Sequence, residues 1–171
     1  MTEESYQSPE PTWASRDAIQ KFAEFMANSL NFGHGDDIDK LVKRLGGKVT
    51  YPKKDLEVDG WRMKNSLFVE SLSDFHIFIE SRAFDQRNRF TIAHELGHLF
   101  LHSDNGSKKI EAKRGGSSRV EREANWFAAE FLMPQEQVKK LKLSGKTAYQ
   151  MADIFGVSPT AMLVRIESLV P

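Results

Sequence analysis

The run HELGH at residues 94–98 has the pattern HExxH, whose residue types and spacing are suited to holding a catalytic metal ion. On a helix, residues four apart project from the same face, so His94 and His98 would turn both imidazoles to one side. Two imidazole nitrogens placed in this way bind one Zn²⁺ at about 2.0–2.1 Å. Glu95 points about 100° further round the helix, where it would reach a water at the metal without being a ligand. The pattern therefore predicts zinc-dependent hydrolysis with Glu95 as the general base.

The residues around this motif are apolar on nearly every side of the expected helix, which predicts that the helix is buried. They are Phe90, Ile92, Ala93, Leu96, Leu99, Phe100 and Leu101. Two imidazoles and a carboxylate buried without partners would be costly, so we expect a metal ion or hydrogen-bonding groups beside them. Gly97 carries no side chain next to the histidines, and we expect another segment of backbone to approach it there.

A catalytic zinc needs a third protein ligand, and three residues compete for that position. Asp104 follows His98 at the distance that some HExxH proteins use, but Leu101 stands where that longer pattern needs a glycine. His102 lies a further turn along the helix, which suits a role in supporting a ligand or in the core better than direct coordination. Glu121 is the third candidate, and it lies on the next expected helix.

A helical wheel of that next helix separates its carboxylates. Glu121 falls within the apolar side, which is made by Val120, Ala124, Phe127, Ala128, Phe131 and Leu132. Glu123 falls with Glu130 on the opposite side, so we expect both to face solvent and a change at Glu123 to matter little. Asn125 stands one turn after Glu121 and is placed to hydrogen-bond the outer atom of a metal ligand.

The elements that must position these residues predict an α+β fold, with helices first, then a small antiparallel sheet of about three strands, then helices. The expected helices cover 13–30, 38–45, 86–102, 119–133, 135–143, 147–155 and 159–169. The expected strands cover 49–51, 66–70 and 75–80. Residues 103–118 contain Asn-Gly and Gly-Gly pairs, which predict a mobile surface loop.

We expect a disordered tail at 1–12, a zincin-like metallopeptidase domain at 13–143, and a helical cap at 144–171 that belongs to the same compact unit. The cap resembles a helix-turn-helix. Its second helix offers only Arg165 for reading bases, so direct nucleic-acid binding is not expected. A protein partner would instead dock on apolar cap residues or on the basic loop at 108–114. The apolar residues in question are Phe155, Val157, Met162 and Ile166.

Composition limits the class of protein. The 24 basic side chains balance 24 acidic ones, which argues against a protein that lives on nucleic acid. The chain has no cysteine and therefore no disulfide framework or thiol nucleophile. No apolar run is long enough to cross a membrane, and the acidic N-terminus is unlike a signal peptide, so a cytoplasmic protein is expected.

Three segments of the chain resemble the ImmA/IrrE family of metallopeptidases. They are RFTIAHELGHLFLH at 89–102, EREANWFAAEFLMP at 121–134 and FGVSP at 155–159. The resemblance implies a gluzincin-like site in which His94, His98 and Glu121 hold zinc and Glu95 acts as the base. It also implies a protein substrate, typically a helix-turn-helix repressor that is cleaved to derepress genes of a mobile element or of a stress or defence response.

The alternative is a non-proteolytic regulator that uses the zinc fold and the C-terminal helices to engage a partner or DNA. The intact HExxH favours the enzyme, because a binding module has no need of Glu95. A peptidase also needs a donor that stabilises the developing oxyanion. The sequence offers His34, His76 and Tyr149, among others, and does not choose between them.

Overall fold

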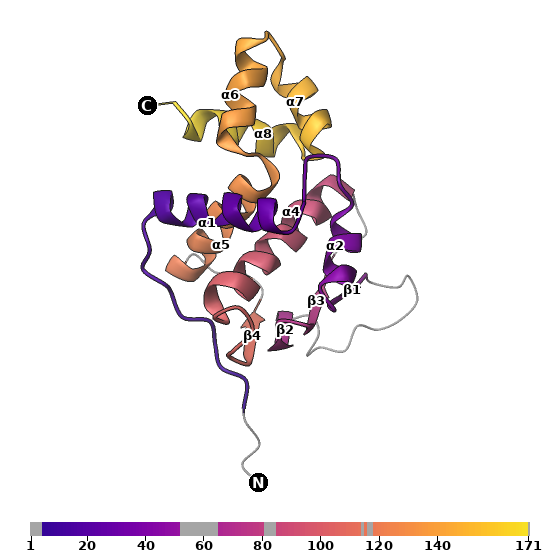
Figure 1. The fold of residues 1–171 in the computed structure, drawn as a ribbon, viewed down its shortest axis with the longest axis vertical. Helices are drawn as coiled ribbons and strands as arrows, with labels where there is room; N and C mark the ends of the chain where they lie inside the picture. Colours follow the sequence, from indigo (N-terminus) through magenta and orange to yellow (C-terminus); the bar gives the residue numbers. More distant parts are fainter. Residues whose placement is uncertain (1–4, 52–64, 81–84, 114, 116–117, 171) are drawn as a thin grey trace.

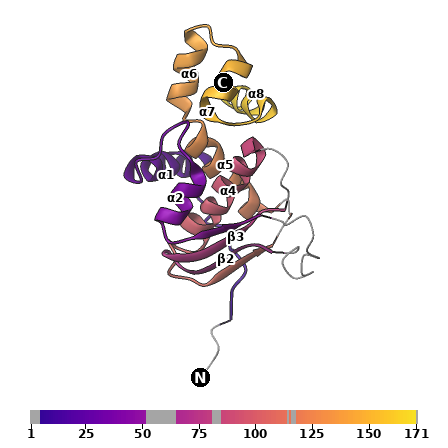
Figure 2. The same ribbon diagram turned by 90° about the vertical axis from the view of Figure 1, so that its right-hand side faces the viewer.

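The computed structural model of the chain describes residues 5–51, 65–80, 85–113, 115 and 118–170. These residues form a sheet, a layer of helices on one face of it, and a helical cap beyond that layer (Figure 1, Figure 2). The helix layer consists of α1 (Arg16–Ser29), α2 (Ile38–Arg44), α4 (Asp85–Gly97) and α5 (Arg119–Leu132). The expected α+β class is therefore confirmed.

The sheet has four strands rather than three, and it is mixed rather than antiparallel. Its strands are β1 (Lys48–Thr50), β2 (Asn65–Ser71), β3 (Asp74–Phe78) and β4 (Ile110–Lys113), in the order β1-β3-β2-β4. β1 runs parallel to β3, whereas β2 is antiparallel to both β3 and β4. β4 lies inside the segment expected to be a loop. It was missed because glycines on both sides of it predict turns, and the strand itself has only four residues, of which Ile110 and Ala112 point into the core.

The strand expected at 75–80 is present as β3, which turns alternate side chains to the two faces of the sheet. Phe75 and Ile77 point into the core with Leu67 and Val69 of β2, and all four are fully or almost fully buried. Burying the apolar face of a sheet against helices is the main source of stability in such a layer, at about 25 cal/mol per Å² of apolar surface. The core lies between the sheet and the helices, where it supports the helix carrying HExxH.

The helix layer is held together by the packing of α1 and α4 on α5. α1 buries Ile19, Ala23 and Ala27, which recur every fourth residue on one face. It begins after Ser15, whose side chain caps the helix by accepting a hydrogen bond from the N–H of Ala18 at 3.1 Å. The helix expected from Trp13 therefore starts three residues later.

The helix expected to run unbroken to His102 changes character at His98. α4 ends at Gly97, and the five residues His98–His102 form a π-helical turn, η1. The N–H of Ser103 reaches back to the carbonyl of His98 at 3.1 Å, five residues earlier. Such turns are rare inside helices and recur at functional sites.

Part of the segment expected to be a disordered tail contacts the sheet, while residues 1–4 lie outside the described part. Gln7 forms a parallel bridge to Ile110 at the edge of the sheet. Its N–H donates to the carbonyl of Lys109, and its carbonyl accepts from the N–H of Glu111, both at 2.9 Å. The position of β4 at the end of the sheet explains this contact, because the outer edge of a strand provides backbone donors and acceptors for a passing chain.

The last three helices are α6 (Gln135–Leu143), α7 (Ala148–Phe155) and α8 (Pro159–Ser168), in agreement with the expected helices, and α7 and α8 lie within the cap at 144–171. The apolar residues considered as a docking surface are mostly core, since Phe155, Val157 and Met162 are completely buried. The basic loop considered second contains β4. No helix in the described part of the chain is long and apolar enough to cross a bilayer.

Candidate metal centre

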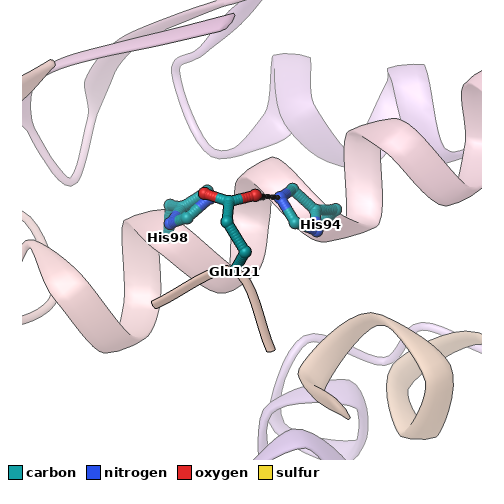
Figure 3. Close-up of side chains that lie close together, drawn as sticks. All are labelled: His94, His98 and Glu121. Carbon is teal, nitrogen blue, oxygen red and sulfur yellow. Dashed lines mark hydrogen bonds and ion pairs between the residues drawn. The ribbon is translucent and has the colours of Figure 1, made fainter. Parts of the chain in front are cut away.

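Three side chains converge where α4, η1 and α5 meet: His94, His98 and Glu121 (Figure 3). The Nε2 atom of His94 lies 3.1 Å from Oε2 of Glu121, and Nε2 of His98 lies 3.4 Å from Oε1. The two Nε2 atoms are 3.1 Å apart. Ligand atoms about 2.0–2.1 Å from a tetrahedral zinc ion lie about 3.3 Å from one another, so these donors fit zinc in both type and spacing.

The close crossing of α4 and α5 brings the carboxylate to the imidazoles. A Cβ atom on Gly97 would lie 3.1 Å from Cα and 3.2 Å from the carbonyl oxygen of Ala124, so only a glycine allows this approach without a shift. The expectation that another backbone approaches Gly97 is confirmed. Ser118 caps α5, which begins at Arg119, and therefore fixes Glu121 in the first turn, facing α4.

Asn125 controls which nitrogen of His94 is available to a metal ion. Its Oδ1 atom lies 2.8 Å from Nδ1 of His94. An amide oxygen only accepts hydrogen bonds, so the proton of the neutral imidazole sits on Nδ1 and the lone pair on Nε2 points toward Glu121. Partners of this kind hold the ring in its ligating orientation.

Glu95 lines a cleft beside the three donors, and among the described residues one of its carboxylate oxygens has no hydrogen-bond donor. The cleft has a volume of about 270 Å³, and its walls include Ser66, Thr91, Lys113 and Asn125 besides Glu95, His94 and Glu121. Glu95 is only 3% exposed, and its Oε2 atom has no partner among the described residues. An unpaired buried carboxylate oxygen is costly, so this atom is poised to accept a proton or hydrogen bond from a molecule in the cleft.

The electrostatics of the cluster favour a cation. Burial alone raises the pKa of Glu121, but hydrogen bonds from His94 and His98 outweigh it and hold the pKa well below its ordinary value. Burial alone lowers the pKa of His94, but the hydrogen bond to Glu121 and the negative charges of Glu95 and Glu121 together outweigh it and raise the pKa. The three donor atoms therefore attract positive charge, whether a proton or a metal ion.

Asp104, the other carboxylate considered as the third ligand, does not belong to the cluster of His94, His98 and Glu121. Asp104 sits on an exposed turn with a φ of 52°, and its carboxylate accepts a hydrogen bond from Oγ of Ser107 at 3.1 Å. Of the candidates for stabilising an oxyanion, His34 contacts Gln137 and His76 contacts Thr50. Neither of these histidines nor Tyr149 is among the described residues that line the cleft. Lys113, a residue of the basic loop that was not among these oxyanion candidates, does line it.

The expectation that Glu123 and Glu130 face solvent is wrong, since they are 0% and 5% exposed. Glu123 accepts hydrogen bonds from residues 12–13 and from Arg119, and Glu130 pairs with Arg165 of α8. A helical wheel describes only the helix itself, whereas these donors come largely from distant segments. The one local sign was Arg119, which stands four residues before Glu123 and so forms a pair on the same helix face.

Comparisons with known proteins agree with this geometry. The sequence model of the peptidase family described as the IrrE N-terminal-like domain matches residues 62–167, more than half of the chain. Metallopeptidase ImmA of Bacillus subtilis (strain 168) is 32% identical over 75 residues, a match that covers 42% of this chain and 44% of that relative. The similarity thus spans less than half the length of the relative. The extent of the family match nevertheless establishes that the chain belongs to the ImmA/IrrE family, the peptidases with an IrrE N-terminal-like domain.

Proposed function

We propose that this protein is a zinc-dependent endopeptidase, with His94, His98 and Glu121 as the metal ligands and Glu95 as the general base. Membership of a peptidase family supports the general activity. The observation that carries the proposal is that His94 and Glu121, which converge with His98, line one cleft with Glu95. The Oε2 atom of Glu95 has no hydrogen-bond partner among the described residues. A protein that only binds a partner has no use for a carboxylate oxygen held without a donor.

In the proposed peptide hydrolysis, Glu95 and Asn125 have separate roles beside the metal ligands. A zinc ion at this site would supply Lewis acidity, which polarises a peptide carbonyl and makes water acidic near neutral pH. Glu95 takes a proton from the attacking water on Oε2 and then delivers it to the nitrogen of the leaving amine. Asn125 keeps His94 oriented by accepting its Nδ1 proton. The burial of Glu95 excludes bulk water, which strengthens each of these polar interactions.

The substrate we propose is a folded protein, specifically a helix-turn-helix repressor whose cleavage derepresses genes. The sequence resemblance to the ImmA/IrrE family supports the repressor, and the small cleft supports a docked protein. A cleft of about 270 Å³ holds only a few peptide residues, so specificity needs contacts remote from the scissile bond. We also propose that residues 13–143 and the cap at 144–171 act as one unit, because Arg165 of α8 bonds to Glu130 and Met133.

The experiment is cleavage of a helix-turn-helix repressor encoded beside this protein, by the zinc-loaded parent and by Glu95→Gln. Glu95→Gln should keep the parent zinc content and repressor binding but lose cleavage by at least about 100-fold, the effect of removing a general base. Glu136→Gln, at an exposed carboxylate of α6, is the matched control and should cleave like the parent. Parent-like cleavage by Glu95→Gln would refute the mechanism. A zinc-loaded parent that binds the repressor without cleaving it would favour the non-proteolytic alternative.

A further inference from the structure

Glu123, two residues after the proposed ligand Glu121, is a completely buried carboxylate with five hydrogen-bond donors around it. Oε2 accepts from the N–H and the hydroxyl of Thr12, both at 2.9 Å, and lies 3.1 Å from Nε2 of His102. Oε1 accepts from the N–H of Trp13 at 3.0 Å and from Nε of Arg119 at 2.8 Å. So many donors fix the position of the carboxylate and keep it an acceptor only.

Because the Glu123 carboxylate can only accept hydrogen bonds, it determines which ring nitrogens of His102 and His98 are donors and which are acceptors. His102 donates from Nε2 to Glu123, so in the neutral ring its Nδ1 atom is an acceptor. That atom lies 2.9 Å from Nδ1 of His98, which must therefore be the donor. With its proton on Nδ1, His98 turns the lone pair of Nε2 toward Glu121 and His94. The chain of contacts thus dictates the ligating form of His98.

The π-helical turn and the N-terminal segment both contribute to this arrangement. His98 and His102 are the first and last residues of η1, and within this turn their Nδ1 atoms come within hydrogen-bond distance of each other. At the other end of the chain of contacts, Trp13 has a φ of 59°, a left-handed conformation that a bulky residue adopts only at a cost. Its N–H donates to Glu123, and its ring lies under the guanidinium of Arg119, which is 5.7 Å from the ring centroid. Both contacts help to hold this backbone conformation.

We propose that Glu123 is a positioning residue of the metal site. Held by Thr12 and Trp13, it orients His102, which in turn holds His98 with Nε2 turned to the metal. This inference rests on the proposed zinc site, to which it adds a supporting residue and a link to the N-terminal segment. In metal sites generally, loss of such a supporting partner lowers metal affinity about 10–100-fold.

The test is the zinc dissociation constant of four full-length proteins, measured by competition with a chromophoric chelator. They are the parent, Glu123→Gln, His102→Phe and the double variant. We expect each single change to weaken zinc binding about tenfold or more. In the double variant Glu123→Gln should add nothing to the effect of His102→Phe, because the route from Glu123 to His98 is already broken. Glu130→Gln, at another buried ion-paired carboxylate of α5, is the matched control and should keep the parent affinity.

Three results would overturn the inference. The first is parent affinity in Glu123→Gln, and the second is an equal loss from Glu123→Gln with and without His102, which would indicate a general structural effect. A parent that binds no zinc would refute the proposed site and the inference with it. If the parent binds zinc and either of the first two results is found, the inference about Glu123 is refuted but the proposed zinc site is not.

A spectroscopic measurement on the unmutated protein covers the case in which Glu123→Gln does not fold. Long-range ¹H–¹⁵N spectra of the zinc-loaded parent report which ring nitrogen of each histidine carries the proton. We expect protonated Nδ1 on His98 and protonated Nε2 on His102. A proton on Nδ1 of His102 would reverse the direction of the contacts and overturn the proposal.

Discussion

Gly97 on α4 and Ala124 on α5 approach so closely that a Cβ atom on Gly97 would lie 3.1 Å from Cα of Ala124. Gly97 stands between the two histidines of the HExxH motif, and Ala124 stands three residues after Glu121. The separation of the two helices at this point therefore sets the distance from the imidazoles to the carboxylate. A glycine lowers helix propensity at this position, but it allows the close approach on which the candidate metal site depends.

Replacing Gly97 with valine should push α5 away from α4. We expect a loss of about 1–3 kcal/mol of unfolding free energy, as overpacking costs in other cores, together with weaker zinc binding. Chemical denaturation and chelator competition measure the two effects. Gly33→Ala is the control, because a Cβ there meets only the Asp36 side chain at 3.7 Å. If Gly97→Val is as stable and binds zinc as tightly as the parent, the contact does not set the site.

Replacing Glu121 with alanine should weaken zinc binding about 100-fold or more, since loss of a ligand should cost at least as much as loss of a supporting partner. The remaining donors, His94 and His98, cannot complete a three-ligand site. Metal analysis after dialysis measures the zinc content. Asp104→Ala is the control, because its carboxylate lies on an exposed turn and should leave the content at the parent level. Full zinc in Glu121→Ala with loss in Asp104→Ala would assign the third ligand to Asp104.

The donor cluster was predictable from sequence because each part of it depends on a short-range rule. The spacing of His94 and His98 fixes their shared helix face, and the apolar stripe of α5 selects Glu121. Glu123 was misassigned because its burial depends on residues more than 100 positions away, of which helix periodicity carries no trace. The π-helical turn after Gly97 was missed for a related reason, since a one-residue change in hydrogen bonding leaves the apolar pattern unaltered.

The sheet was predicted only in part, again because pairing is non-local. The hairpin of β2 and β3 has its two strands adjacent in sequence, and both were identified within two residues. β4 pairs with β2 across more than 40 residues, and β1 pairs in parallel with β3, which no local pattern encodes. Residues 1–12 were expected to form a disordered tail because they contain few apolar groups, yet the backbone of Gln7 bonds to the β4 edge.

Gln7→Pro should release the N-terminal segment from this edge. Proline has no N–H, so the bond from residue 7 to the carbonyl of Lys109 is lost. The amide of Glu111, which donates to the carbonyl of Gln7, should then exchange with solvent about tenfold faster, the effect of roughly one net hydrogen bond. Hydrogen exchange monitored by NMR measures this rate. Gln7→Ala keeps the N–H and should exchange like the parent, and equal rates in all three proteins would mean that the bridge does not protect Glu111.

Arg165 should contribute to stability rather than to DNA recognition. Its side chain is buried, pairs with Glu130, and donates from Nε to the carbonyl of Met133 at 3.0 Å, which ties α8 to the end of α5. Arg165→Met would leave the Glu130 carboxylate buried without its cation, a change that costs about 3–5 kcal/mol in other proteins. Urea unfolding followed by circular dichroism measures the loss. Lys142→Met, at an exposed position of α6, should change stability by no more than about 0.5 kcal/mol. If the two variants are equally stable, the ion pair does not hold the cap to the domain, and Arg165 is free to have another role.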